Sequence, residues 1–353
     1  MKLKPLRSKI DSIDSKIVRL LNMRTKIILS IAGLKQKDGK DVYAPDRERQ
    51  VLRRVTALNR GPISAKALEA IYREVMSSSL SLEKPIKIGY LGPQASFSHL
   101  AALKRFGSQI ECLALESISD VFMEVERGTA DYGVVPIENS IEGAVSHTLD
   151  MFIDSDLKIC AQVILDVCHN LLANCLIEKI KRVYSNPQVF GQCRHWLEEN
   201  LPHVEKIEVS STTRAAQIAA KEKNSAAIAS VLAARVYKLK VLASDIEDSP
   251  HNVTRFLVIG RTEVPKTGSD KTSVVFSVKD RIGALHEMLA PFKKYNINLT
   301  KIESRPSKKK AWDYYFFADL KGHQGEPKVK KALAELEEKC NFLKILGSYP
   351  IGE

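Results

Sequence analysis

The first quarter of the chain carries the hydrophobic period of α-helices. Apolar residues recur at three- and four-residue steps from Leu6 to Ile31, which predicts a helix of about 30 residues. A second helix is expected at the cap-like stretch PDRERQVLRRV and a third at ISAKALEAIYREVMSSSLSLEK. No strand pattern interrupts these periods. The sequence therefore predicts an all-α domain over residues 1–85.

From residue 86 the pattern changes to short apolar runs, each followed by a polar loop and a helical period. The segments that show it are IKIGYLGPQASFSHLAAL, ADYGVVPIENSIEGAVSHTLDMF, KIKRVYSNPQVFGQCRHWL and KIEVSSTTRAAQIAA, and the strand in SPHNVTRFLVIG ends the series. Open α/β sheets keep their ligands at the carboxyl ends of the strands. These loops therefore predict an α/β domain over residues 86–262 with a shared anion-binding cleft.

After the polar linker RTEVPKTGSDK, the periodicity predicts a third domain over residues 271–353. The expected elements are a strand at 272–278, a helix at 281–295, strands at 297–305 and 312–320, a helix at 327–339 and a strand at 342–348. This βαββαβ order is ferredoxin-like, which is an α+β fold.

Composition is that of a globular protein: 353 residues, 44% hydrophobic and 27% charged. No stretch approaches the roughly 18 apolar residues of a membrane span, so we expect a cytoplasmic protein without a membrane partner. The six cysteines never occur at CxxC spacing. This favours free thiols over a zinc site or a disulfide framework.

The net charge of +12 is concentrated at the N-terminus, where residues 1–85 hold 19 Lys and Arg against 9 Asp and Glu. An anionic partner is therefore expected, either nucleic acid or a small multiply charged acid. Nucleic acid would fit a ligand-responsive transcriptional regulator with a basic helical N-terminus. The first helix is too long for a helix-turn-helix element, so we favour the small acid and expect no nucleic-acid partner.

Several polar residues of the first domain share helix faces. Arg24 and Lys35 are eleven residues apart, a rotation of about 20°, so both cations can converge on one ligand. Arg7 points about 100° away from Arg24 and is better placed to serve a neighbouring subunit. Ser79 and Glu83 lie at i and i+4 on the third helix.

Together, the segments LRSKIDSIDSKIVRLLNMRTKII, GLKQ, PDRERQVL and SSSLSLE resemble the all-helical chorismate mutase family over residues 4–84. The resemblance implies chorismate as substrate, prephenate as product, and an intertwined dimer in which Arg7 reaches the partner's site. It marks Arg24 and Lys35 as catalytic. The substrate-binding residues that it implies are Arg7, Arg24, Lys35, Arg47, Glu48, Ser79 and Glu83. Some relatives carry Gln at Glu83, which bears on the pH optimum.

The segments YLGPQASFSHLAA, VVPIENSIEGAVSHTLD, YSNPQVFGQC, SSTTRAA and NVTRFLVIG look like prephenate dehydratase. The resemblance implies a two-lobed fold like that of periplasmic binding proteins, with Thr254 as the essential residue that either relays a proton or holds the departing hydroxyl. The substrate-binding residues that it implies are Ser96, Glu138, Asn139, Ser140, Gln188, Ser211, Thr212, Thr213, Thr254, Arg255 and Phe256. Ala95 and Ser96 replace the usual Gly-Thr, and Asn186 stands where many relatives have His.

The segments RIGALHEML and INLTKIESRPSKKKAWDYYFFADLKGH resemble the ACT regulatory domain of phenylalanine-synthesising enzymes. The resemblance implies allosteric inhibition by phenylalanine; the alternative is a dimerisation module without a ligand. The effector-binding residues that it implies are Gly283, Ala284, Leu285, His286, Glu303, Ser304, Arg305 and Pro306. His286 departs from the apolar or aromatic residue of many relatives, which bears on effector affinity.

The three resemblances together predict a bifunctional enzyme of phenylalanine biosynthesis. It is expected to be a homodimer or homotetramer, and to need neither a metal nor an organic cofactor.

Overall fold

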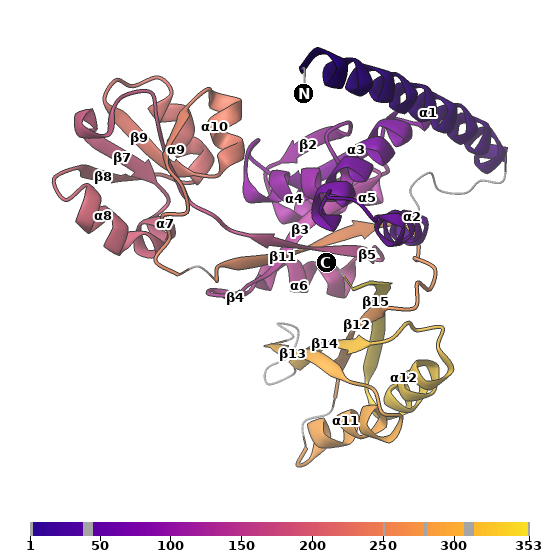
Figure 1. Ribbon diagram of the computed structural model, residues 1–353. Helices are drawn as coiled ribbons and strands as arrows, with labels where there is room; N and C mark the ends of the chain where they lie inside the picture. The colour runs from indigo at the N-terminus through magenta and orange to yellow at the C-terminus, as the bar shows by residue number, and fades with distance from the viewer. Residues whose placement is uncertain (1–2, 38–44, 250, 279–280, 307–313, 352–353) are drawn as a thin grey trace. The chain divides into compact units, whose positions relative to one another are not determined.

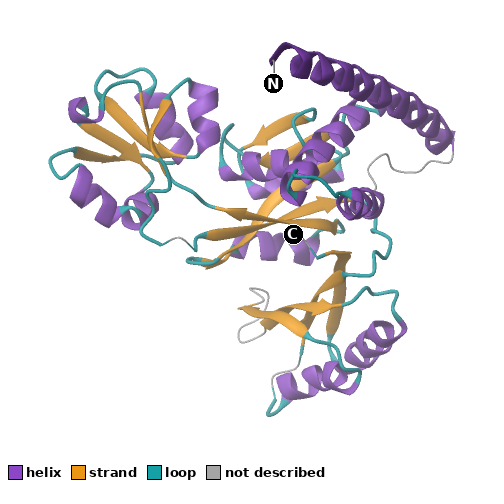
Figure 2. Ribbon diagram, viewed as in Figure 1, coloured by secondary structure: helices purple, strands orange, loops and turns teal. Residues whose placement is uncertain are grey.

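The computed structural model describes residues 3–37, 45–249, 251–278, 281–306 and 314–351. The chain forms two compact units, which are described separately. One comprises Met1–Ile86 with Phe106–Glu111, and the other comprises Lys87–Arg105 with Cys112–Glu353. Figure 1 labels most of their elements, and Figure 2 distinguishes helices from strands.

The first unit is helical, as predicted. Its helices are α1 (Leu3–Lys37), α2 (Pro45–Leu58) and α3 (Ala65–Glu83). Helix α2 begins at Pro45, with Asp46 and Glu48 in its first turn, where acidic side chains complement the helix dipole. The Ser64 hydroxyl caps α3 by accepting the backbone N–H of Ala67 at 3.2 Å.

Helix α1 leaves its apolar residues unusually exposed. Ile10 is 57% exposed, Ile13 54% and Ile17 48%, and these three residues belong to the stripe that the sequence pattern identifies. A water-soluble helix normally buries such a stripe. Helix α1 is therefore incomplete as the packing element of a single chain.

The second unit begins with a two-lobed α/β fold, which confirms the predicted class. The sheet of the first lobe runs in the order β2-β1-β3-β11-β5, with β4 paired to β3. Strand β3 is parallel to β1, whereas β11 is antiparallel to both β3 and β5. The elements of this lobe are β1 (Lys87–Leu91), α4 (Phe97–Phe106), β2 (Glu111–Leu115), α5 (Ile118–Glu126), β3 (Tyr132–Asn139), β4 (Gly143–Ala144), α6 (Ser146–Asp154), β5 (Lys158–Asp166) and β11 (Val253–Gly260).

The chain leaves the first lobe after β5, builds the second lobe, and returns in β11 (Figure 1). The sheet of the second lobe runs in the order β10-β6-β9-β7-β8 and combines parallel with antiparallel pairs. The elements of this lobe are β6 (Asn170–Ala173), the 3-10 helix η1 (Ile177–Lys179), β7 (Arg182–Ser185), α7 (Pro187–Gln192), α8 (Arg194–Asn200), β8 (Glu205–Glu208), α9 (Thr212–Ala219), β9 (Ser225–Ala229), α10 (Val231–Tyr237) and β10 (Lys240–Ala243).

The C-terminal segment has the predicted βαββαβ order and a four-stranded antiparallel sheet, β13-β14-β12-β15. Its first helix starts three residues later than predicted, after Gly283 at φ +78. The elements are β12 (Asp270–Ser277), α11 (Ala284–Lys294), β13 (Leu299–Pro306), β14 (Tyr314–Lys321), α12 (Pro327–Lys339) and β15 (Phe342–Pro350).

The two faces of this third sheet bury different sets of side chains. Val274 and Phe276 of β12 pack with residues of α11 and α12. Val275, which points the other way, shares a hydrophobic core with Leu257 and Ile259 of the first lobe. Leu346, Phe317 and Tyr349 belong to that same core. The C-terminal sheet and the first lobe therefore have one interior in common.

Strands β15 and β5 approach closely at Gly347. This residue has φ +152, and a Cβ atom placed there would lie 2.5 Å from the carbonyl oxygen of Ile159. Every other residue type carries that atom, so only glycine fits the position without a shift of the backbone.

Candidate active sites

The helical unit contains a cavity of about 420 Å³, a size that suits a small organic molecule. One part of its wall is apolar and is formed by Ile27, Ile28 and Ile31 of α1 with Val51 and Val55 of α2. The polar and remaining lining residues are Arg24, Arg47, Glu48, Gln50, Arg54, Met76, Ser79, Leu80 and Glu83. The cavity therefore joins an apolar wall to a cluster of cations.

The cationic part of the cavity is held by hydrogen bonds. Arg24 Nη1 donates to Ser79 Oγ at 3.0 Å, and Ser79 Oγ donates to the carbonyl of Val75 at 2.8 Å. Burial lowers the pKa of Arg24 from its ordinary value, and the neighbouring charge of Arg47 acts in the same direction. Cations that are partly desolvated and close to one another favour an anionic ligand.

Five of the seven residues expected in the mutase site line this cavity: Arg24, Arg47, Glu48, Ser79 and Glu83. Arg7 does not line it and is exposed on α1. The side chain of Lys35 lies outside the described residues.

Arg54 is a lining residue that the sequence analysis missed. It stands seven residues after Arg47 on α2, and seven residues are close to two full turns of an α-helix. That spacing was a usable signal for a second cation on the same helix face.

The site of the second unit centres on two residues that face each other across neighbouring strands. Thr254 of β11 is directly opposite Asn139 of β3 in the sheet register. Asn139 Nδ2 donates to Thr254 Oγ1 at 2.8 Å. The orientation of this amide is fixed, because Asn139 Oδ1 accepts the backbone N–H groups of Ile141 and Glu142. Thr254 Oγ1 is thus a hydrogen-bond acceptor from Asn139, and its own proton is free to point elsewhere.

A chain of hydrogen bonds that converges on Gln192 supports this pair. Asn139 Nδ2 also donates to Asn252 Oδ1, and Asn252 Nδ2 donates to Gln192 Oε1 at 3.0 Å. His169 Nε2 lies 2.8 Å from the same Gln192 oxygen, which assigns the ring proton to Nε2. Burial lowers the pKa of His169, which favours the neutral ring.

Asn252, Gln192 and His169 were not among the expected site residues. Asn252 stands two positions before Thr254, in a turn whose polar character was already evident in the sequence. His169 and Gln192 lie far from Thr254 in sequence, and no periodicity connects them.

Gln188, another residue of α7 in the second lobe, also bonds to the first lobe. Its Nε2 donates to Glu142 Oε2 at 3.0 Å. The neighbouring Asn186 donates from its side chain to the carbonyl of Ser210 at 3.3 Å. Ser211 caps α9, and Thr213 in its first turn is buried. Among the described residues, the Thr213 hydroxyl has no hydrogen-bond partner. An unsatisfied hydroxyl at a helix N-terminus suits an anionic group of a ligand.

Two expected residues are engaged in bonds within the first lobe. Ser96 Oγ donates to the carbonyl of Leu91 at 3.0 Å and accepts the backbone N–H of His99. Ser140 Oγ donates to the carbonyl of His251 and accepts the backbone N–H of Val253. Ser140 therefore ties the end of β3 to the start of β11.

The structure does not bring Glu138 and Arg255 to the Thr254 group. They are opposite each other in the register of β3 and β11, one position along from Asn139 and Thr254. Successive side chains of a strand point to opposite faces, and Arg255 makes its bonds with Gln162, Asp319 and Tyr349. The third expected residue of this motif, Phe256, is 2% exposed.

The residues expected to bind an effector lie at two places in the C-terminal segment. Gly283 stands at the N-terminus of α11, and a Cβ built there would meet no atom within 4 Å. Leu285 and His286 are exposed, and the neighbouring Ile282 is 100% exposed. Of the β13 group, Arg305 pairs with Ser146 and Asp150 of α6.

One group of possible metal ligands occurs among the described residues: Cys168, Asp245 and Glu247 bring one ligand atom each within 4.8 Å of one another. Burial raises the pKa of the Cys168 thiol to about 12, and the nearby carboxyl groups act in the same direction. Among the described helices, none has both the length and the apolarity to cross a bilayer.

Comparison with known proteins assigns each segment to a family. The family "Chorismate mutase type II" matches residues 6–84, "Prephenate dehydratase" matches residues 88–264, and "ACT domain" matches residues 272–338. The bifunctional chorismate mutase/prephenate dehydratase of Aquifex aeolicus is 52% identical, over 99% of this chain and 98% of that protein. The protein of the same description from Pseudomonas aeruginosa is 45% identical, over 99% and 97% of the two chains.

A solved structure supports the assignment of the second unit. The prephenate dehydratase of Arthrobacter aurescens, determined in complex with L-Phe, is 34% identical and superposes with a TM-score of 0.70. The match covers 75% of this chain and 90% of that one. Since relatives with this degree of identity match the chain over nearly its whole length, it belongs to the family of bifunctional chorismate mutase/prephenate dehydratases with a C-terminal ACT domain.

Proposed function

We propose that the cavity of the helical unit converts chorismate to prephenate, and that the group around Thr254 converts prephenate to phenylpyruvate. The hydrogen bond from Asn139 to Thr254 is the observation that carries the second assignment, because it orients the Thr254 hydroxyl beside the carboxyl end of β3. We place the three domains at residues 1–85, 86–262 and 271–353.

The first reaction is a pericyclic rearrangement, which needs no nucleophile and no base. It needs the substrate dicarboxylate held in a folded conformer, and stabilisation of the negative charge that develops on the breaking ether oxygen. Arg24, which is held by Ser79, provides a fixed cation, Arg47 and Arg54 add two further cations, and the isoleucines of α1 provide an apolar wall for the ring. Lys35 is proposed as the cation at the ether oxygen.

The second reaction removes a carboxylate as carbon dioxide and the ring hydroxyl as water, and one proton must reach the departing hydroxyl. A threonine is a poor acid, but a hydroxyl whose lone pair accepts from Asn139 can donate a hydrogen bond to the departing hydroxyl. We therefore assign Thr254 to hold the departing hydroxyl, and Thr213 with the α9 N-terminus to a carboxylate.

Phenylalanine is proposed to inhibit the second reaction by binding at Gly283–His286 and Glu303–Pro306. The ACT family match and the L-Phe complex of the Arthrobacter protein support this assignment. The α11 N-terminus offers backbone N–H groups to a carboxylate, and Gly283 leaves open space for the approach. The exposed Ile282 and Leu285 fit a site completed by a second C-terminal domain.

A homo-oligomer is proposed, with α1 as one of its interfaces. The exposed stripe of α1 matches the intertwined dimer expected of an all-helical chorismate mutase, in which Arg7 enters the partner's cavity. A cytoplasmic location is also proposed, because all six cysteines are free.

The decisive experiment supplies chorismate to the purified chain with no added cofactor and follows prephenate and phenylpyruvate with time. Both products should appear in that order. In Thr254→Ala, prephenate should accumulate while chorismate is consumed at the normal rate. If a folded Thr254→Ala protein still forms phenylpyruvate, or loses both activities together, the assignment of Thr254 is wrong.

A further inference from the structure

Strand β11 presents two consecutive residues of one motif to opposite sides of its sheet. Thr254 pairs with Asn139 on the side of the dehydratase site, and Arg255 pairs in register with Glu138 on the other side. The side of Arg255 is the one that packs on the C-terminal sheet, because Arg255 contacts Asp319 of β14 and Tyr349 of β15. One peptide unit therefore connects the catalytic side of β11 to the ACT domain.

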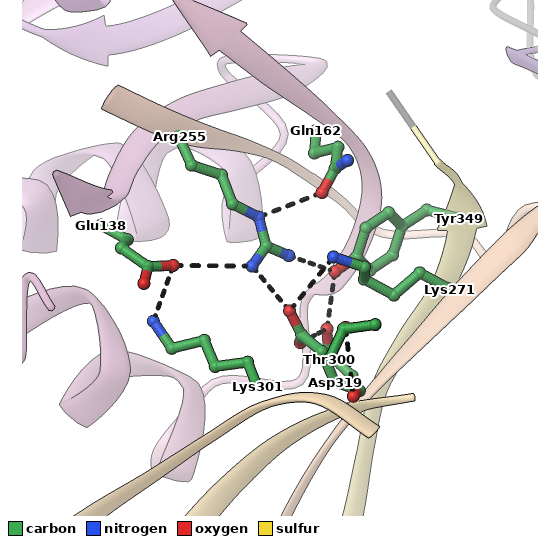
Figure 3. A network of polar contacts seen from close by, with 9 residues as sticks. Glu138, Gln162, Arg255, Lys271, Thr300, Lys301, Asp319 and Tyr349 are labelled. Atoms are coloured by element: carbon green, nitrogen blue, oxygen red, sulfur yellow. Dashed lines mark hydrogen bonds and ion pairs between the residues drawn. The ribbon is translucent and has the colours of Figure 1, made fainter. Parts of the chain in front are cut away.

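The guanidinium of Arg255 is held from three directions (Figure 3). Its Nε donates to Gln162 Oε1 at 3.0 Å on the neighbouring strand β5. Its Nη1 donates to Asp319 Oδ2 at 2.6 Å, and its Nη2 donates to Tyr349 Oη at 2.8 Å. Such a multiply bonded guanidinium has little freedom, and its position is set by strands of both domains.

The groups around Arg255 form a charge network in a largely buried place. The Arg255 side chain is 12% exposed and that of Asp319 is 9% exposed. Lys271 lies 3.6 Å from Asp319 Oδ2, and Lys301 lies 2.9 Å from Glu138 Oε2. The Ser273 hydroxyl donates to the second oxygen of Asp319 at 2.5 Å.

The electrostatic environment favours the ionised forms of both Asp319 and Arg255. Burial by itself would raise the pKa of Asp319, but the charges of Arg255 and Lys271 and the hydrogen bond from Ser273 hold it below its ordinary value. Burial opposes the charge of Arg255 as well, and the groups of Tyr349 and Asp319 more than offset that effect, so its pKa is raised. Removing Asp319 would leave the buried Arg255 charge without its nearest ion-pair partner, because Glu138 is 3.9 Å away and Asp319 is 2.6 Å away.

We propose that Arg255 is a positioning residue for the dehydratase reaction: by tying β11 to Asp319 and Tyr349, it sets where the Thr254 hydroxyl stands. The proposal rests on the assignment of Thr254 above. Displacement of a reacting group by about 1 Å costs on the order of 10²-fold in rate. A shift of the C-terminal sheet against the first lobe would therefore reach Thr254 through this contact.

A second cross-domain contact distinguishes positioning from general stabilisation. Lys344 Nζ of β15 donates to the carbonyls of Ile153 and Ser155, at 3.2 and 2.7 Å. These residues precede β5, whose first residue, Lys158, pairs with Gly260 at the far end of β11. Six residues of strand separate Gly260 from Thr254, which is about 20 Å. Lys344 thus joins the same two domains far from the site.

The test compares Asp319→Asn and Tyr349→Phe with the matched control Lys344→Met. Steady-state kinetics with prephenate would be measured on the full chain, and circular dichroism with a thermal unfolding curve would report how much of each sample is folded. Asp319→Asn should lower kcat for dehydration at least about tenfold with KM changed less than about threefold, and Tyr349→Phe should lower kcat by a smaller factor. Lys344→Met should lower the free energy of unfolding and leave kcat unchanged.

The proposal is overturned if Asp319→Asn keeps a kcat within about twofold of the wild type, or if Lys344→Met lowers kcat as much as Asp319→Asn does. If Asp319→Asn does not fold, Tyr349→Phe decides, because it removes only the hydroxyl that bonds to Arg255 and Ser273 and keeps the shape of the side chain. An unchanged kcat in that variant overturns the proposal. A wild-type chain without dehydratase activity would instead refute the assignment of Thr254.

Discussion

At the residue scale, Asn139 limits what Thr254 can do. Its amide oxygen is committed to two backbone N–H groups, so its nitrogen must donate to the Thr254 hydroxyl. The sequence left open whether Thr254 relays a proton or holds the departing hydroxyl. The donor that occupies the Thr254 lone pair is a neutral amide, which is not an acid and cannot replace a lost proton. This favours a hydroxyl that holds the departing group by a hydrogen bond.

Exchanging the amide of Asn139 for a carboxylate should reverse this hydrogen bond. In Asn139→Asp the carboxylate can still accept from Ile141 and Glu142, but it would also accept the Thr254 proton and turn it away from the substrate. We expect kcat for dehydration to fall by about 10²-fold, the usual cost of losing one oriented donor. Kinetics with prephenate measure this, and unaltered mutase activity serves as the control. A dehydratase rate near that of the wild type would refute the orientation.

Asp319 should give the protein a pH-dependent stability. A carboxyl group with a lowered pKa contributes stability above its unfolded value of 3.8 and loses it as the pH falls through the folded value. The difference in unfolding free energy between the wild type and Asp319→Asn should thus be full at about pH 6 and shrink below about pH 4. Urea denaturation at both pH values measures it. A difference that grows on acidification would contradict the lowered pKa.

The sequence analysis named Thr254 and Asn139, which the structure brings together, but it did not identify the side chains that surround them. Residues next to each other in a strand face opposite sides, so Thr254 and Arg255 could not both face one site in a regular strand, and the same holds for Glu138 and Asn139. The two-residue period of a strand was enough to predict that Thr254 and Arg255 lie on different faces of the sheet. The partner of Arg255 was not predictable, because Asp319 comes from another domain and no periodicity connects the two.

At the element scale, α1 shows what a hydrophobic period can and cannot predict. Its length of 35 residues is close to the expected helix, because the apolar stripe and the absence of Pro from its interior determine it. The stripe also predicts a packing surface, but it does not identify the partner that covers this surface. In the single chain, α3 packs on only part of α1, and Ile13 stays about half exposed.

A charge in the exposed stripe should therefore damage the mutase. Ile13→Asp places a carboxylate where we propose that a second chain packs, so mutase activity should fall by about tenfold or more while dehydratase activity remains. Ser15→Asp, on the opposite side of α1, is the matched control and should leave both activities intact. Equal mutase rates in the two variants would show that the stripe is not an interface.

At the scale of the whole molecule, the ACT domain and the first lobe are one structural body rather than two joined by a linker. Val275, Phe317 and Leu346 share a core with Leu257 and Ile259. The sequence suggested separable domains, because the polar stretch at 261–271 reads as a linker. Packing between two sheet faces leaves no mark in the sequence beyond a strand that is apolar on both sides, such as β12.

Removing the ACT domain should hence damage the dehydratase itself. A chain that ends at Pro265 would expose the first-lobe part of this core, at about 1.5–3 kcal/mol for each large side chain uncovered. We expect dehydratase activity to be lost at a lower temperature than in the full chain. The temperature at which mutase activity is lost should stay the same. Activity after heating at a series of temperatures measures this. Equal inactivation temperatures for the two chains would show that the shared core adds no stability.

Gly347 has a consequence for the exchange of regulatory domains between proteins. Its backbone lies so close to Ile159 that a single added carbon atom would collide with the chain. A sensor domain transplanted from another protein would need glycine at this position in order to pack against this dehydratase, whatever ligand it binds. The fit of two backbones would then decide which sensors can be fused to this enzyme before any question of ligand specificity arises.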